Sequence, residues 1–267
     1  MSEQQQSTES VGTANRFSPS PLETAVHSAS AELLTAAAAD PSLTEDLALA
    51  LVKRSDLPAE ALVGLSKNPG VSKQRKVRVG IVQHPKTPRH ISVPMLRVLY
   101  TFDLMNTALA AVVPADVKRG AENVLFTRLE SISSGEKLAL ARRASGRIAA
   151  ELLLDKESRV MRAALENARL TEAAVIKALG RRDASGELVN AVCHHAKWSR
   201  PRDVRIALLR NEKTPLARAL EFARSVPPSM FHEILRNSHL PAGTKAYLLK
   251  DFEQRTGRSR HTPQSEL

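Results

Sequence analysis

Basic residues are concentrated in a stretch that contains no acid. Between Ala61 and Phe102 the chain has eight lysines or arginines and no aspartate or glutamate. The densest part is SKQRKVRVG at 72–80, and Lys86 and Arg89 follow it. Phosphate groups are natural partners for such a run, because cations that meet phosphates release counterions. The alternative is a solvated basic helix start that acids of neighbouring segments neutralise.

A second set of basic residues lies within 197–210, a stretch in which Asp203 is the one acidic residue. Its members are Lys197, Arg200, Arg202, Arg205 and Arg210. An ion pair between Arg205 and an acid of the same repeat is the favoured interpretation here. The candidate contacts to a partner or to phosphate are therefore Lys73, Arg75, Lys76, Arg78, Lys86, Arg89, Arg200, Arg202 and Arg205.

Four further residues invite a chemical role, and each has a structural alternative that we favour. Cys193, His194 and His195 are consecutive, and adjacent residues of a helix do not face one ligand position. We therefore expect a buried cysteine and a histidine that caps a helix, with no metal. Trp198 would stack on a base or anchor a partner. It occupies a repeat position that leucine fills elsewhere, so we expect it in the core.

No enzymatic motif is found. The chain has neither the phosphate-binding pattern GxxxxGK[ST] nor the nucleophile pattern GxSxG. With 3% aromatic residues, it also shows no cluster of aromatics and acids that could hold an extruded nucleotide. We therefore expect no catalysis and no cofactor.

Composition predicts helices and places the charge in the body of the chain. Glycine is scarce, with 11 in 267 residues, whereas alanine, leucine and arginine are abundant. Such residues lose little entropy in a helix. The net charge is +11, and residues 31–250 carry +13 because the first thirty residues carry −2 and the last seventeen are neutral. A basic body, more than a basic tail, indicates an anionic partner.

The chain shows no sign of secretion or membrane insertion. One cysteine cannot form an intrachain disulfide, which suits a reducing compartment. The N-terminus lacks a basic region followed by an apolar run, and no apolar run reaches 18 residues. We expect a soluble, cytoplasmic protein without contact to a membrane.

A twelve-residue pattern recurs along the chain and organises these residues. Apolar residues fill positions 1, 5 and often 6, asparagine or histidine is common at 8, and proline, serine or threonine stands at 12. The copies are LALALVKRSDLP (47–58), VRVGIVQHPKTP (77–88), VMRAALENARLT (160–171), LVNAVCHHAKWS (188–199), VRIALLRNEKTP (204–215), MFHEILRNSHLP (230–241) and the weaker DLMNTALAAVVP (103–114). Arg78 and Arg205 share a position, so they would lie on one stripe of a regular array.

Each copy predicts a short helix, a tight turn and the start of the next helix. Asparagine at position 8 suits a helix end because it tolerates the left-handed conformation. Thr87–Pro88 and Thr214–Pro215 are typical of an N-cap followed by proline at the first helical position. Thr171 is expected to cap without proline. The spacing is near 26 residues where it is regular, and such helix pairs bury their apolar faces by stacking.

The pattern apolar–Arg–x–Ala–Leu–x–x–Asn–x–x–Thr–Pro at 204–215 resembles the leucine-rich-repeat-variant units of bacterial proteins. These units belong with HEAT-like α-solenoids, and the resemblance covers roughly 45–250. It implies a curved helical array with an interaction surface and no chemistry. Some members carry an N-terminal cysteine cluster for an iron–sulfur centre, which this chain lacks.

We therefore expect an all-α, right-handed α-solenoid of short stacked helix pairs over residues 29–253. Residues 1–28 and 254–267 are polar and are expected to be disordered. Helices near 29–39 and 241–254 should close the two ends, and helices within 115–155 should be longer and off the period. The expected function is a non-enzymatic scaffold that binds a protein or peptide. A nucleic-acid-binding solenoid with a basic face is the alternative.

Overall fold

The computed structural model describes residues 20–259, and this part contains seventeen helices and no strand. The prediction of an all-α protein is confirmed. Most of the segments that were expected to be disordered, 1–19 and 260–267, lie outside the described residues. Within residues 20–259, no helix has both the length and the apolar character needed to cross a membrane.

Within the described residues, the chain forms two compact units that divide between Met95 and Leu96. The helices of the first unit are α1 (Pro21–Val26), α2 (Ala31–Ala39), α3 (Glu45–Val52), α4 (Ala59–Lys67), α5 (Arg75–Gln83) and α6 (Arg89–Leu96), which ends on the first residue of the second unit. Helices one repeat apart contact each other in this unit: α1 with α3, α2 with α4, and α3 with α5.

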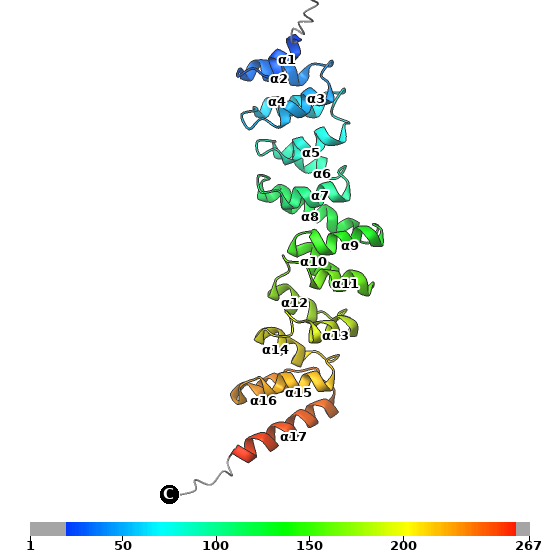
Figure 1. Cartoon of the computed structure of the whole chain (residues 1–267), viewed down its shortest axis with the longest axis vertical. Helices are drawn as coiled ribbons and strands as arrows, with labels where there is room; N and C mark the ends of the chain where they lie inside the picture. The colour runs from blue at the N-terminus through cyan, green and yellow to red at the C-terminus, as the bar shows by residue number, and fades with distance from the viewer. Residues whose placement is uncertain (1–19, 260–267) are drawn as a thin grey trace, which may run out of the picture. The chain divides into compact units, whose positions relative to one another are not determined.

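The second unit holds eleven helices of the described chain. They are α7 (Thr101–Leu109), α8 (Ala115–Arg128), α9 (Ser134–Arg143), α10 (Gly146–Leu152), α11 (Ser158–Leu165), α12 (Glu172–Leu179), α13 (Gly186–His194), α14 (Arg202–Arg210), α15 (Leu216–Arg224), α16 (Pro228–Arg236) and α17 (Ala242–Ser259). Helices α8, α10, α12, α14 and α16 contact one another in order and form a row that we call the even row (Figure 1). Odd-numbered helices also contact one another: α9 contacts α11, α11 contacts α13, and α15 contacts α17. Contacts between near neighbours are consistent with a repeat array.

Two boundaries differ from the sequence prediction. Helix α1 lies inside the segment 1–28 that was expected to be disordered. It forms because Ser20 and Glu23 make a reciprocal capping box and because Val26 is fully buried. Helix α17 extends to Ser259, five residues past the expected end of the closing helix at 254.

The apolar positions of the repeat form the core, as predicted. In α14, Val204, Leu208 and Leu209 occupy positions 1, 5 and 6 and are buried. The corresponding residues of α5 are also buried. Because these positions lie one turn apart, each helix presents one apolar stripe to its neighbours. Of the longer helices expected within 115–155, α8 has 14 residues, whereas α9 and α10 have 10 and 7, so the expectation holds for α8 alone.

The asparagine at position 8 ends its helix by a different mechanism from the one predicted. No non-glycine residue in the described chain has a positive φ, so the left-handed cap is wrong. Asn167 is 1% exposed, and its Nδ2 donates to the carbonyl oxygens of Ala141 (2.7 Å) and Ala144 (3.2 Å). Its Oδ1 accepts from the N–H of Arg169 (2.8 Å). One carboxamide thus closes its own turn and binds the helix end one repeat earlier.

The same arrangement recurs with asparagine and with histidine. His84 places Nε2 2.9 Å from the carbonyl oxygen of Arg54, while its Nδ1 accepts from the N–H of Lys86. The accepted bond assigns the ring proton to Nε2, so the imidazole repeats the donor and acceptor pattern of a carboxamide. Side chains with this geometry, which we call bridging residues, are Asn68, His84, Asn167 and Asn211.

The Thr-Pro pairs also act differently from the prediction. Thr214 does not cap α15; its hydroxyl donates to the carbonyl oxygen of Leu208 at 2.6 Å, and Pro215 stands at the N-cap. The buried hydroxyl of Thr87 makes the equivalent bond to Ile81. Both hydroxyls donate to the preceding helix because its last carbonyl oxygens have no donor within that helix. Thr171, by contrast, caps α12 as predicted.

Gly146 marks a close approach between neighbouring helix pairs. A Cβ at this position would lie 2.1 Å from the backbone oxygen of Arg169. Such a distance excludes any side chain without a shift of the backbone. The beginning of α10 is therefore held directly against the turn that follows α11.

Candidate functional site

The six basic candidates of the first unit gather around the start of α5 and the turn after it. Lys73, Arg75 and Lys76 are exposed at the beginning of that helix, and its N-cap residue makes no side-chain capping bond. Lys86 and Arg89 are exposed in the turn and at the start of α6. A hydrogen bond from Arg54, supported by the charge of Lys86, lowers the pKa of Asp56.

Arg78 and Arg205 make equivalent hydrogen bonds in their respective repeats. The Nε of Arg78 donates to the carbonyl oxygen of Ser72 at 2.8 Å, and the Nε of Arg205 donates to that of Ser199 at 2.9 Å. Their equivalence in the repeat is therefore reproduced in the structure. Arg205 therefore donates to a carbonyl oxygen instead of forming the ion pair that the sequence analysis favoured. Because the two arginines lie in different units, a common stripe stays a prediction.

The other basic candidates of the second unit lie at the start of α14. Arg200 and Arg202 are exposed, and the guanidinium of Arg202 contacts Sδ of Met230. Nearby Trp198 is 2% exposed, and its Nε1 donates to the carbonyl oxygen of Leu165 at 2.8 Å. The prediction of a core tryptophan is confirmed.

Cys193 is fully buried, and burial raises the pKa of its thiol to about 11. His195 caps α13, as predicted, and its Nε2 lies 3.1 Å from a carboxylate oxygen of Glu166. The Nδ1 of His194 faces the carbonyl oxygen of Asn190. Among residues 20–259, no group of three potential ligands could hold a metal ion.

Much of the positive charge serves the fold, which the sequence analysis did not anticipate. Basic side chains donate to main-chain carbonyl oxygens roughly one repeat earlier. The pairs are Arg54 with Val26, Arg128 with Leu99 and Arg97, Arg169 with Arg143, Lys213 with Ala184, and Arg218 with Cys193. Most of these oxygens belong to helix ends or the turns after them, where carbonyls lack a helical partner and cations are favoured. Net charge alone therefore overstates the charge available to a partner.

Two grooves lie on the even row of the second unit. The first, which we call the Arg147 groove, has a volume of about 750 Å³ and is formed by α8, α10 and α12. Its half-buried apolar residues are Phe126, Ala150, Leu154 and Ala174. Its charged residues are Glu130, Arg147, Glu151, Lys177 and Arg181. The guanidinium of Arg147 lies 4.6 Å above the ring of Phe126 and 3.2 Å from Glu122.

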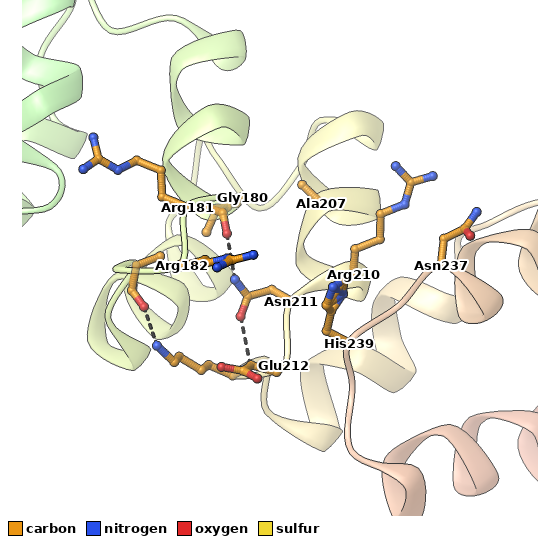
Figure 2. A pocket seen from close by; sticks show the side chains of 12 residues that line it. Gly180, Arg181, Arg182, Ala207, Arg210, Asn211, Glu212, Asn237 and His239 are labelled. Carbon is orange, nitrogen blue, oxygen red and sulfur yellow. Dashed lines mark hydrogen bonds between the residues drawn. The ribbon is translucent and has the colours of Figure 1, made fainter.

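The second, the Arg210 groove, has a volume of about 400 Å³ and follows the ends of α12, α14 and α16 (Figure 2). Four basic residues and one acid line it: Arg181, Arg182, Arg210, Lys213 and Glu212. Asn211 bridges across it, donating to the carbonyl oxygen of Leu179 at 2.8 Å. The N–H of His239 donates to the carbonyl oxygen of Arg210 at 3.0 Å, which fixes the next turn.

The basic side chains of the Arg210 groove divide into two pairs. Arg181 binds Asp183 at 2.7 Å and Glu151 at 3.4 Å, and the bond to Asp183 raises the pKa of Arg181. Lys213 donates to the carbonyl oxygen of Ala184. Within residues 20–259, the guanidinium groups of the other two, Arg182 and Arg210, make no hydrogen bond or ion pair.

The two grooves share Arg181 and therefore adjoin each other. Together they form a surface along α8, α10, α12, α14 and α16 with an apolar part and a basic part. Sequence analysis placed Arg210 in a basic set and did not single out Arg182 or the groove-lining Asn237. The signal available was the position-8 asparagine at 237, and its surroundings depend on tertiary contacts.

Comparison of the chain with protein-family models, with curated proteins and with solved structures finds no match. The surface of the even row is therefore interpreted from its own chemistry.

Proposed function

We propose that this protein is a non-enzymatic helical-repeat scaffold that binds an extended segment of a partner protein along the even row. The proposed fold is the right-handed α-solenoid of the leucine-rich-repeat-variant type that the repeat pattern resembles. The observation that carries the function is the pair of adjoining grooves joined at Arg181.

The linings of these grooves suit a polypeptide. Half-buried Ala150, Leu154 and Ala174 offer apolar area to side chains of a partner, and the charged rim would orient it. Bridging residues hold the helix ends on which the grooves are built. A site held in place before binding loses less entropy when the partner arrives.

A nucleic acid fits this surface less well. Glu130, Glu151 and Glu212 line it and would repel phosphates. Phe126 is the one phenylalanine, tyrosine or tryptophan of the two grooves, and Arg147 covers its ring. Single strands usually gain affinity from aromatic side chains on which bases stack.

A random peptide library displayed on phage tests the proposal. Peptides selected on the wild-type protein should bind the Ala174→Trp variant at least about tenfold more weakly, since indole would fill the Arg147 groove. Ala173→Trp is the matched control, because this neighbouring residue is exposed on α12 and lies outside the groove. Equal binding to all three proteins would contradict the proposal, provided that circular dichroism shows equal folding.

The first unit supports a second candidate function, the binding of nucleic acid. Lys73, Arg75 and Lys76 surround the start of α5, where main-chain N–H groups and the helix dipole favour anions. Fluorescence anisotropy with single-stranded DNA, duplex DNA and RNA, between about 50 and 200 mM salt, tests it. Binding should weaken in Lys73→Glu/Lys76→Glu and persist in the charge-matched control Lys53→Glu/Lys67→Glu. Equal binding by both variants would exclude the α5 site.

A further inference from the structure

We infer that the Arg210 groove binds an acidic stretch of polypeptide, with carboxylates on Arg182 and Arg210. This inference rests on the proposed function and names the chemistry of the segment that the even row would receive. It concerns the basic part of the surface, where four cationic side chains and one carboxylate line the groove.

The cationic side chains available to a ligand are those that make no hydrogen bond or ion pair within the fold. Arg181 and Lys213 are held by Asp183 and by the Ala184 carbonyl oxygen, respectively. Arg182 and Arg210 are exposed, line the same groove and lack partners within residues 20–259. Guanidinium groups bind carboxylates through paired, charge-assisted hydrogen bonds, so an acidic side chain would satisfy each of them.

The backbone on either side of these arginines is fixed. Arg182 follows α12, whose end is bridged by Asn211, and both residues line the groove (Figure 2). Arg210 ends α14, and its carbonyl oxygen accepts from His239 of the next repeat. The two side chains therefore extend from supports that need no rearrangement on binding.

Asn237 supplies a group that can recognise a peptide main chain. It stands at the bridging position of the 230–241 repeat, yet no hydrogen bond of its carboxamide is found within residues 20–259. The carbonyl oxygen of Arg210, one repeat earlier, is taken by the N–H of His239. Asn237 lines the groove near Arg210 (Figure 2). One amide donor and one acceptor match the needs of an extended strand.

The groove favours carboxylates of a polypeptide over phosphates of a nucleic acid. Its volume of about 400 Å³ suits a single narrow chain, and no phenylalanine, tyrosine or tryptophan lines it. Glu212 lines the groove together with the cations. The regularly spaced phosphates of a nucleic acid would be repelled by this carboxylate, whereas a peptide can place an uncharged residue beside it.

Fluorescence anisotropy with a labelled peptide of alternating glutamate and glycine tests the inference. The wild-type protein should bind it at about 50 mM salt and lose affinity toward 200 mM. Arg182→Gln/Arg210→Gln should bind at least about tenfold more weakly, because both guanidinium groups that would bind the carboxylates of the peptide are removed. Lys156→Gln/Lys250→Gln, which removes two exposed charges outside the groove, should bind as wild type.

Two further measurements make the result specific. Asn237→Ala should weaken peptide binding while leaving the affinity for free glutamate unchanged, since only the peptide offers a main chain. An oligothymidylate should bind less tightly than the acidic peptide at equal salt. Tighter binding of oligothymidylate through the two arginines would overturn the inference.

The failure of this inference can be told from failure of the proposed function. No binding of the acidic peptide by wild type, or equal binding by Arg182→Gln/Arg210→Gln, overturns the inference. Phage-selected peptides that lose affinity for Ala174→Trp would still support binding along the even row. If those peptides are absent as well, both proposals fail.

Discussion

At the scale of single residues, the chain uses asparagine and histidine as interchangeable bridges. Asn167 and His84 each accept a bond from the N–H two residues later and contact a carbonyl oxygen one repeat earlier. The repeat tolerates either residue because a carboxamide and a neutral imidazole offer the same pair of groups. This explains why either residue occupies position 8 in the copies that contain His84, Asn167 and Asn211.

The bridge predicts a specific mutational series. Asn167→Ala should lower the free energy of unfolding by about 3 kcal/mol, because two buried carbonyl oxygens lose their donor. Asn167→His should lose less, since His84 shows that imidazole fits this geometry. Urea denaturation followed by circular dichroism measures both values. A loss no smaller for histidine than for alanine would contradict the equivalence.

At the scale of the elements, α10 meets the turn after α11 closely at a residue that has no side chain. Gly146 begins α10 against the backbone oxygen of Arg169, whereas Gly135 in α9 has no atom within 4 Å of an added Cβ. The two glycines look alike in the sequence and have opposite surroundings in the fold. Neither has a positive φ, so contact alone distinguishes them.

Substitution of these glycines by alanine should therefore have opposite effects. Gly146→Ala should destabilise the protein by about 1–3 kcal/mol, because its Cβ forces the two segments apart. Gly135→Ala should be neutral or stabilising by up to about 1 kcal/mol, because alanine favours the helix. Thermal unfolding of both variants beside wild type provides the measurement. Equal destabilisation would show that the approach at Gly146 is looser than described.

At the scale of the whole molecule, contacts join near neighbours, so stability should be local. Asp251 of α17 binds Arg224 of α15 at 2.7 Å and Arg255 at 2.8 Å. The hydrogen bond from Arg224 is the main cause that lowers the pKa of Asp251 below its ordinary value of 3.8. The carboxylate thus stabilises the folded form above about pH 4, and this contribution is lost as the pH falls through the lowered pKa.

Acid and the Asp251→Asn substitution should loosen the same helices. Hydrogen exchange corrected for intrinsic rates should be several-fold faster in α15 and α17 of Asp251→Asn at pH 7, and unchanged in α9 and α11. Wild type should reach the same state only below about pH 4. If exchange accelerates equally throughout the second unit, the unit unfolds as one cooperative body.

The sequence by itself determined the helical class, the repeat and the buried positions. Apolar residues at window positions 1, 5 and 6 must share a face of any helix, so Val204, Leu208 and Leu209 were predictable as core. Trp198 was predictable for the same reason, since it replaces a leucine of the pattern. The basic stretch 72–80 was visible as charge.

Only the tertiary structure decided which polar groups are used within the fold and which remain available. Thr214 and Asn167 looked like local caps, yet they bond to carbonyl oxygens because neighbouring helix ends leave acceptors unpaired. Arg181 and Arg182 are adjacent in sequence, but one is held by Asp183 and the other lines the groove without a partner among residues 20–259. Hydrogen-bond partners one repeat away have no signature in local spacing, so the candidate site emerged from packing between repeats.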